Sequence, residues 1–137
     1  MSKVMIIQPD SAPPPILMFL SSLDGKLQRK LDLQIRRLAF TPVSALTEPH
    51  YKHFTIAKYS RLFELRERGR VLVRIIFTIQ EDGTVILLEP FIKRHKRITM
   101  QALDSSLKIL ARIEQRPGLL IEYGSRDALS RKEGKAI

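Results

Sequence analysis

Arg74 lies within an otherwise almost wholly apolar run, VLVRIIFTI, at positions 71–79. A strand of this composition is buried on both faces, and arginine is rarely buried without a partner. Since successive side chains of a strand point to opposite faces, Arg74 shares its face with Leu72 and Ile76. Two compatible interpretations stay open: an ion pair with Glu64 on the preceding predicted strand, or a site that binds an anion.

A second group of chemically capable residues is the run KRHKR, in which four cations surround one histidine. The run consists of Lys93, Arg94, His95, Lys96 and Arg97. It joins a predicted strand to a predicted helix, whose N-terminus carries a partial positive charge that also favours anions. Alone, such a run is typical of a solvated loop or a general nucleic-acid patch. Close to Arg66 and Arg74, it indicates a more specific anion site.

Histidine is the first candidate for a general acid or base, because this side chain exchanges protons near neutral pH. The histidines are His50, His53 and His95, and the next candidates are Glu64, Tyr51 and Tyr59. The sequence contains no HExxH motif, no glycine-rich phosphate loop, no GxSxG and no paired-carboxylate signature. No metal and no cofactor are therefore expected, and any catalysis would depend on cationic side chains.

The length of 137 residues suits a single domain, 1–137, that can bury a core of its own. Cysteine is absent from the sequence, which excludes disulfides, zinc fingers and thiol catalysis. No apolar stretch approaches the ~20 residues of a membrane span, and none near the start is long enough for a signal peptide. We expect a cytoplasmic protein.

The net charge is strongly positive, since 24 Lys and Arg against 14 Asp and Glu give +10. Residues 52–97 hold 11 basic and 5 acidic residues, so this third of the chain carries +6. Candidate partners are nucleic acid, an anionic membrane surface or an acidic protein. Arginine outnumbers lysine by 14 to 10, which favours phosphate as the target because guanidinium binds it through two hydrogen bonds.

Helical patterns precede this basic region. The prolines at 13–15 introduce a short predicted helix at 16–23, and Asp24 is a suitable N-cap for a second helix. The apolar face of that second helix consists of Leu27, Leu31, Ile35 and Leu38. Residues 40–60 are expected to form a loop with one irregular turn, and residues 4–7 are compatible with a short first strand.

Strand patterns follow at 61–67, 71–80 and 84–92, each bounded by a turn signal. The short spacing leaves no room for crossover helices, so the strands are expected to form an antiparallel meander. A last helix is predicted at 99–114. The remaining tail, 118–137, is expected to add an edge strand or dock on the body, with disorder from residue 125 onward.

The first hairpin determines which side chains accompany Arg74. A three-residue connection at 68–70 would pair Glu67 with Val71. With this register, Leu62, Glu64 and Arg66 lie on the open face with Arg74, and Phe63 and Leu65 lie on the core face. A two-residue turn would move Arg66 to the other face.

Most of the chain, from about residue 16 to 113, resembles the RelE/ParE superfamily of toxins, and specifically its HigB-like, phage-derived branch. The resembling segments, in matching order and spacing, are ILMFLSSLDGKLQRKL, RLFELRERGRVLVRIIF and ILLEPFIKRHKRITMQAL. The resemblance implies an α+β, RelE-like fold with its core at about 16–114. An N-terminal helical hairpin would pack on an antiparallel meander, followed by a C-terminal helix, and a basic concave face would stay open.

The resemblance also implies an activity, because active members of the superfamily enter the ribosomal decoding site and cut mRNA there. By position, Arg74 matches the family's arginine that contacts the scissile phosphate, and Arg66 matches the arginine of its Glu-Leu-Arg motif. Lys93 and Arg94 match the cationic pair at the end of the last strand. HigB-like members use histidine and acidic groups for proton transfer, which leaves His53, His95 and Glu64 as candidates.

Two sets of site residues are therefore expected. The catalytic set is Arg74, Arg66, Arg94, Lys93, His95 and Glu64. The further RNA contacts are Lys96, Arg97, Arg68, Arg70, Lys58 and His53. The chain departs from RelE at two positions, because Glu64 replaces a lysine and Met100 replaces a tyrosine.

The partners implied by the resemblance are mRNA and the ribosome, together with a cognate antitoxin carrying a helix-turn-helix domain. Operator DNA would be bound only through the antitoxin, and no membrane is involved. Two alternatives stay open: a toxin that inhibits DNA gyrase, as the ParE branch does, or a catalytically inactive relative that binds nucleic acid. The two departures from RelE favour the inactive relative.

Overall fold

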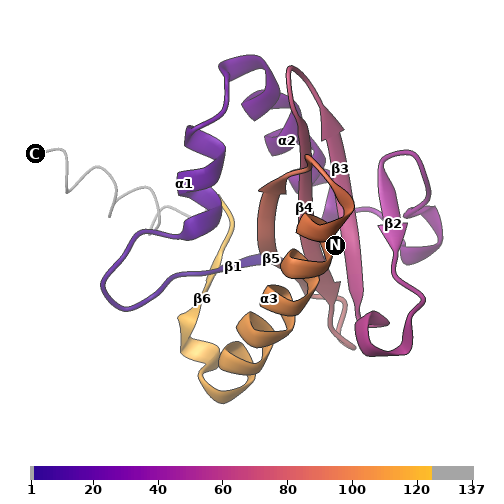
Figure 1. Cartoon of the computed structure of the whole chain (residues 1–137). Helices are drawn as coiled ribbons and strands as arrows, with labels where there is room; N and C mark the ends of the chain where they lie inside the picture. The colour runs from indigo at the N-terminus through magenta and orange to yellow at the C-terminus, as the bar shows by residue number, and fades with distance from the viewer. Residues whose placement is uncertain (1, 125–137) are drawn as a thin grey trace, which may run out of the picture.

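The computed structural model describes residues 2–124 and shows an α+β fold, as the sequence predicts. A six-stranded, mostly antiparallel sheet is accompanied by three α-helices (Figure 1). The strands are β1 (Val4–Ile7), β2 (Tyr51–His53), β3 (Leu62–Arg68), β4 (Leu72–Ile79), β5 (Val85–Ile92) and β6 (Leu120–Glu122). The helices are α1 (Pro15–Ser21), α2 (Gly25–Leu38) and α3 (Lys96–Gln115). Short 3₁₀ turns lie at Val43–Ala45, Ala57–Tyr59 and Pro117–Leu119.

The sheet has the strand order β2-β3-β4-β5-β1-β6. The predicted meander β3-β4-β5 forms its centre, with both strand pairs antiparallel. β1 pairs with β5 in parallel and with β6 antiparallel. The expected N-terminal helical hairpin is not observed in that form, because β1 precedes α1 and α2 and is inserted between β5 and β6.

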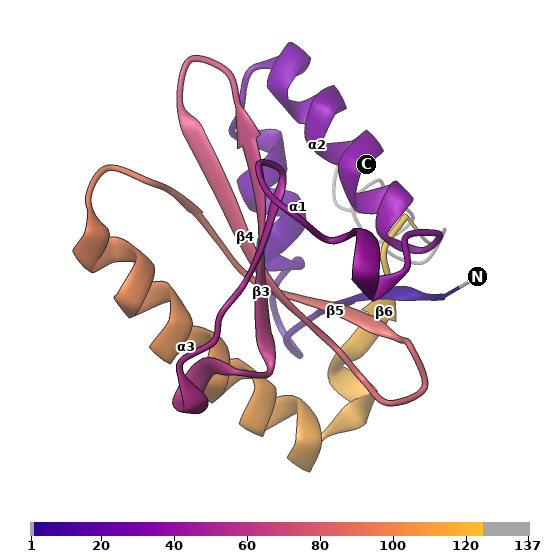
Figure 2. The ribbon, with the colours of Figure 1, turned by 90° about the vertical axis from the view of Figure 1, so that its right-hand side faces the viewer.

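The sheet separates two apolar cores. α1 and α2 cover one face, and α3 crosses the other, as the two perpendicular views show (Figures 1 and 2). Val73, Ile75 and Phe77 of β4 face α1 and α2, as their alternation predicts. The opposite face was expected to stay open, but α3 covers part of it, so that Leu62 is fully buried.

The predicted face of α2 is buried as expected, through Leu27, Leu31, Ile35 and Leu38. Asp24 is its N-cap, because its carboxylate accepts a hydrogen bond of 3.0 Å from the Leu27 backbone N–H. The other faces of α2 are mostly polar, with Leu33 exposed, so the helix is stabilised mainly by this apolar stripe against the sheet.

The β3–β4 hairpin differs from the predicted register. Its loop is 69–71 and not 68–70, and Glu67 pairs with Val73. Moving the pairing partner of Glu67 from Val71 to Val73 is a shift of two residues. Because the side-chain period of a strand is two, this shift leaves every side chain on its predicted face. Arg66 and Arg74 therefore share a face, as expected.

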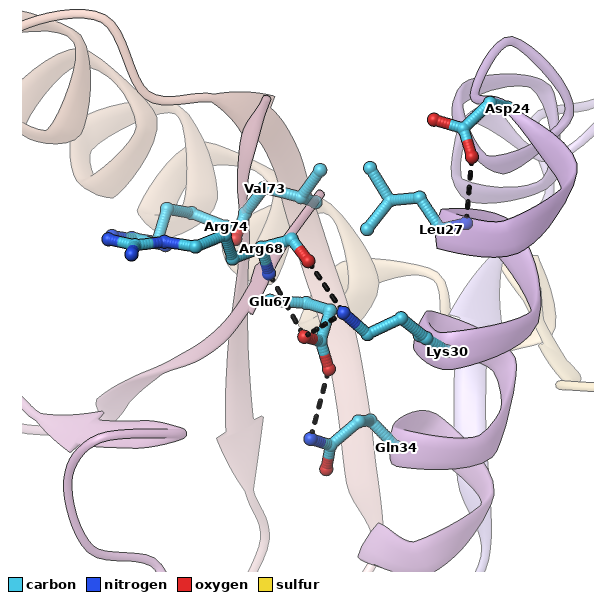
Figure 3. Close-up of polar contacts among 8 residues, drawn as sticks. All are labelled: Asp24, Leu27, Lys30, Gln34, Glu67, Arg68, Val73 and Arg74. Carbon is cyan, nitrogen blue, oxygen red and sulfur yellow. Dashed lines mark hydrogen bonds and ion pairs between the residues drawn. The ribbon is translucent and has the colours of Figure 1, made fainter. Parts of the chain in front are cut away.

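Side chains of α2 contact the end of this hairpin on the face of the sheet that α2 covers (Figure 3). Lys30 donates a 2.7 Å hydrogen bond to the Arg68 carbonyl and lies 3.3 Å from the Glu67 carboxylate. Gln34 donates to the same carboxylate at 3.2 Å. Burial raises the pKa of Glu67, but hydrogen bonds from the Arg68 backbone N–H, Gln34 and Lys30 outweigh burial and lower it overall. Glu67 is thus a fixed anchor on the side of the sheet facing α2.

Two segments differ from their predicted form. Residues 40–60 were expected to form a loop, but they include β2, which pairs with β3. α3 begins at Lys96, three residues earlier than predicted. At the other end, β6 forms the edge strand that the sequence left open as one possibility, and the predicted disorder from residue 125 lies outside the described residues. No helix in residues 2–124 combines the length and apolarity needed to cross a membrane.

Candidate nucleic-acid interface

The cations of β3 and β4 lie in adjacent rows on the face that α3 covers in part. Arg66 is directly opposite Arg74, and the next pair along the hairpin is Arg68 opposite Leu72. The preceding pair on the same face is Glu64 opposite Ile76. The end of β5 continues the row of Leu72, because the backbone N–H of Lys93, which directly follows β5, donates to the Leu72 carbonyl at 2.8 Å. Strand pairing alone therefore brings three guanidiniums and one ammonium together.

Glu64 is the carboxylate beneath these cations, with only 1% of its surface exposed. Its Oε1 accepts a hydrogen bond of 2.8 Å from Arg66 Nε and lies 3.5 Å from Arg74 Nε. The second contact is an ion pair without hydrogen-bond geometry, because Arg74 Nε has no hydrogen-bond partner. Glu64 Oε2 is also buried without one. The predicted ion pair between Arg74 and Glu64 is confirmed, but two arginines share the same carboxylate oxygen.

The burial of Glu64 changes the role expected for it. A general base must touch the hydroxyl whose proton it removes. Glu64 Oε1 already contacts Arg66 and Arg74, and Oε2 is buried without a hydrogen-bond partner. The arrangement makes Glu64 a positioning residue, which holds two arginines through their Nε atoms and leaves most of their N–H donors directed elsewhere.

The cationic side chains around Glu64 outnumber the carboxylates. Burial lowers the pKa of Arg74; Glu64 raises it, but nearby Arg66 and Arg68 lower it further. Burial likewise lowers the pKa of Lys93, again opposed by Glu64 and reinforced by Arg74, Arg66 and Lys52. Cations that depress one another's pKa are electrostatically unfavourable until an anion joins them.

A hollow of about 370 Å³ opens beside these residues. Its lining is Pro49, His50, Arg66, Glu67, Arg68, Leu72 and Arg74. The side chains of Arg68 and Arg74 extend from the sheet on the side away from α2 (Figure 3). A second carboxylate, the exposed Glu48, lies 3.5 Å from Arg66 at the edge. The hollow therefore presents three guanidiniums. The carboxylate of the lining residue Glu67 is bound by Lys30 and Gln34 of α2, and two further carboxylates, the buried Glu64 and the exposed Glu48, lie nearby.

The run 93–97 surrounds the start of α3. Arg94, Lys96 and Arg97 are exposed there and form no ion pair within residues 2–124. His95, expected in the catalytic set, is instead the N-cap of α3, since its Nδ1 accepts a 3.3 Å hydrogen bond from the Ile98 N–H. The first turn of α3 contains no acidic residue. The predicted combination of cations and a helix N-terminus is thus present, next to Lys93.

The structure does not bring all the expected RNA contacts to the hollow. Lys58 is held on the side of α3 by the Asp104 carboxylate at 3.2 Å. His53 pairs with Phe63, and its ring stacks on Phe63 at 4.4 Å, on the face of the sheet opposite Arg66 and Arg74. Arg70 is exposed in the hairpin loop and does not line the hollow.

Because β2 was not predicted, His50 was considered as a histidine for proton transfer but not assigned to the site, and Lys52 was missed altogether. His50 lines the hollow, and its carbonyl accepts a 2.8 Å hydrogen bond from the Arg66 backbone N–H. Lys52 pairs with Glu64. A strand at this position would have revealed both, because alternation puts His50 and Lys52 on one face and His53 on the other.

Comparison with known proteins bears on this arrangement. The model of the family described as phage derived protein Gp49-like (DUF891) matches residues 18–111. The chain belongs to this family. The match runs from α1 to α3 and includes every residue that lines the hollow, whereas β1 and β6 lie outside it. Comparison with curated proteins gives no match.

The Gp49-like family is a RelE-like, toxin-like family of toxin-antitoxin systems, which agrees with the resemblance seen in the sequence. The resembling sequence motifs correspond to successive elements of the fold. In this Gp49-like chain they correspond to α1 with α2, to the β3–β4 hairpin, and to β5 with the start of α3. Within residues 2–124, no group of three or more His, Asp or Glu side chains is placed to hold a metal ion.

Proposed function

We propose that this protein is the toxin of a type II toxin-antitoxin system, of the HigB-like branch, and that it cuts mRNA on the ribosome. The observation that carries the proposal is the convergence of Arg66, Arg68 and Arg74 on one hollow around a single buried carboxylate. Such an excess of guanidinium charge at a concave surface is suited to a phosphate group.

The chemistry needs little from the protein, because RNA supplies its own nucleophile. The 2′-hydroxyl attacks the adjacent phosphorus, and the protein aligns this attack and stabilises the charge that develops on the phosphoryl oxygens. Arg74 and Arg66 would bind these oxygens. Burial lowers the pKa of Lys93, and the charges of Arg74 and Arg66 lower it further, so Lys93 would add a third positive group beside them.

The hollow has a volume suited to one nucleotide unit, since ligand sites in proteins have volumes of about 300–1,000 Å³. The neighbouring RNA backbone would follow the exposed cations at the start of α3. These are Arg94, Lys96 and Arg97. A phosphate there would also meet the free backbone N–H groups of the first helical turn. This path connects the two clusters that the sequence indicated separately.

The ribosome and the antitoxin enter the proposal through the toxin family. The ribosome would fix the mRNA in the geometry that in-line attack requires. A cognate antitoxin with a helix-turn-helix domain would cover the basic face, and would bind operator DNA itself. An acidic segment in the antitoxin would complement the +10 charge of this chain.

The test is cleavage of a defined mRNA in the presence of purified ribosomes, with cleavage sites mapped by primer extension. Cleavage on the ribosome, with little cleavage of naked RNA and unchanged DNA supercoiling by gyrase, supports the proposal. Inhibition of gyrase without RNA cleavage would identify a ParE-like toxin. Binding of RNA with neither activity would identify an inactive relative.

A further inference from the structure

The three histidines of the chain lie in three different environments, and only one of them lies in the hollow. We propose that His50 is the general base that activates the 2′-hydroxyl of the RNA; this inference rests on the nuclease activity proposed above. It follows from where each imidazole ring lies and what it already contacts.

His53 is excluded by the direction of its side chain. It pairs with Phe63, and the two rings are stacked with centroids 4.4 Å apart. Phe63 in turn stacks on Phe77, which lies in the core beneath α1 and α2. One ring nitrogen of His53 is hydrogen bonded to the Ser60 carbonyl at 2.7 Å. The ring is therefore separated from Arg66 and Arg74 by the sheet itself.

His95 is excluded by its structural role. Its Nδ1 accepts the hydrogen bond from the Ile98 backbone N–H that caps α3. If Nδ1 took up a proton, this bond would be lost at the positively charged end of a helix, where a further positive charge is unfavourable. Proton transfer through Nδ1 of His95 would thus compete with the stability of α3.

His50 has neither constraint. It directly precedes β2, and alternation from Lys52 puts its side chain on the face of Glu64, Arg66 and Arg74. Its carbonyl is fixed by the Arg66 backbone N–H at 2.8 Å. Within residues 2–124 no side-chain partner of the ring is found, and the residue is exposed at the lining of the hollow. The imidazole is therefore free to meet a bound RNA.

The lining of the hollow would bring a phosphate next to His50, because Arg66, Arg68 and Arg74 line the same hollow. A neutral imidazole carries one unprotonated nitrogen that can accept a proton, as a general base requires.

The proposed step is balanced without a metal or a cofactor. His50 takes the proton of the 2′-hydroxyl while the O2′–P bond forms and the P–O5′ bond breaks. The leaving 5′-oxygen receives its proton from water. The products are a 2′,3′-cyclic phosphate and a 5′-hydroxyl, after which the imidazolium returns its proton to solvent.

The test compares His50→Ala and His50→Gln with His53→Gln, a matched histidine replacement on the opposite face. Single-turnover cleavage of mRNA on ribosomes is measured, with and without added imidazole, and folding is checked by circular dichroism. Both His50 variants should cleave about 10²- to 10⁴-fold more slowly at saturating ribosome complex, as loss of a general base does. Binding to the programmed ribosome and the rate of His53→Gln should stay within about 3-fold of the unchanged protein.

Imidazole separates a chemical role from a structural one. Added imidazole should restore part of the rate of His50→Ala, since a small base can occupy the space of the missing ring. Folded His50 variants that cleave normally, or that bind weakly and gain nothing from imidazole, would overturn the assignment. Failure of the unaltered protein to cut any mRNA would instead overturn the proposed function, so the two failures are distinguishable.

Discussion

Arg66 and Arg74 lie directly opposite each other on the neighbouring strands β3 and β4, and both reach the same oxygen of the buried Glu64. Like charges directly opposite each other in an antiparallel pair are destabilising. The buried Glu64 carries only one negative charge, and the second carboxylate near the pair, Glu48, is exposed and lies 3.5 Å from Arg66. A sheet that needed only stability would place apolar pairs here, as it does at Phe63 and Phe77. The pair is therefore best explained by the binding of an anion.

The stability of the folded protein should depend on Glu64, which compensates the charges of Arg66 and Arg74. Glu64→Gln removes the buried counter-charge shared by two largely buried arginines, whose side chains are 22% and 13% exposed, and leaves only the exposed Glu48 near Arg66. Removing one partner of a buried charge pair costs about 3–5 kcal/mol, and partial exposure of Arg66 reduces this to about 3 kcal/mol. Urea denaturation at neutral pH measures the change in the free energy of unfolding.

The matched control for Glu64 is Glu114→Gln, which breaks the exposed ion pair of Glu114 with Arg61. An exposed pair contributes roughly 0–1 kcal/mol. Equal losses of stability in the two variants would contradict the role assigned to Glu64 as the buried anchor of the two arginines.

Glu89 should make stability depend on pH. Its carboxylate lies half-buried between β5 and α3, where burial raises the pKa above the ordinary value of 4.5; a 3.4 Å hydrogen bond from Ser105 opposes this only in part. Between 4.5 and the raised pKa, the folded state binds more protons than the unfolded state, so the free energy of unfolding falls as pH rises. Above that window the folded protein carries the full cost of the buried charge.

Glu89→Gln should therefore be more stable than the unaltered protein at pH 7, and this gain should vanish below about pH 4. Urea titrations at the two pH values measure the difference, and Glu81→Gln in the exposed turn serves as the control. A Glu89→Gln protein that is less stable at neutral pH would show that the ionised carboxylate is favourable where it lies.

The cations at the start of α3 should act at long range. Replacing both Arg94 and Arg97 with alanine is expected to lower kcat/KM for ribosomal mRNA about 10-fold at low salt, because exposed charges steer association and are screened by salt. The loss of kcat/KM should become smaller at about 0.3 M salt. The corresponding double replacement of Lys26 and Arg29 on α2, on the other face, should have little effect. A deficit that is independent of salt would argue against steering.

The sequence predicted the central elements because their patterns are local. The apolar spacing of Leu27 to Leu38 and the cap at Asp24 are properties of one helix. The faces of the β3–β4 hairpin were also predicted correctly, although the register was not, since a shift of two residues preserves the side-chain alternation. This is why Arg66, Arg74 and Glu64 could be grouped without a structure.

The features that escaped prediction depend on contacts between distant segments. β2 has three residues and acquires its form only by pairing with β3, so His50 and Lys52 could not be assigned to a face. The burial of Leu62 depends on how α3 crosses the sheet. His95 lies among four cations in the sequence, which suggested a catalytic role, but the structure shows that it caps the N-terminus of α3.

The central claim is that Arg74 binds the scissile phosphate of an mRNA. Its most direct test is to induce the unaltered protein and Arg74→Ala separately in cells, and to map the 5′ ends of cellular mRNA. Arg61→Ala, which removes an exposed arginine at the other end of the sheet, is the control. We predict new 5′ ends within coding regions for the unaltered protein and the control, and a reduction of about 10²- to 10³-fold for a folded Arg74→Ala. New 5′ ends at undiminished frequency with folded Arg74→Ala would contradict the claim.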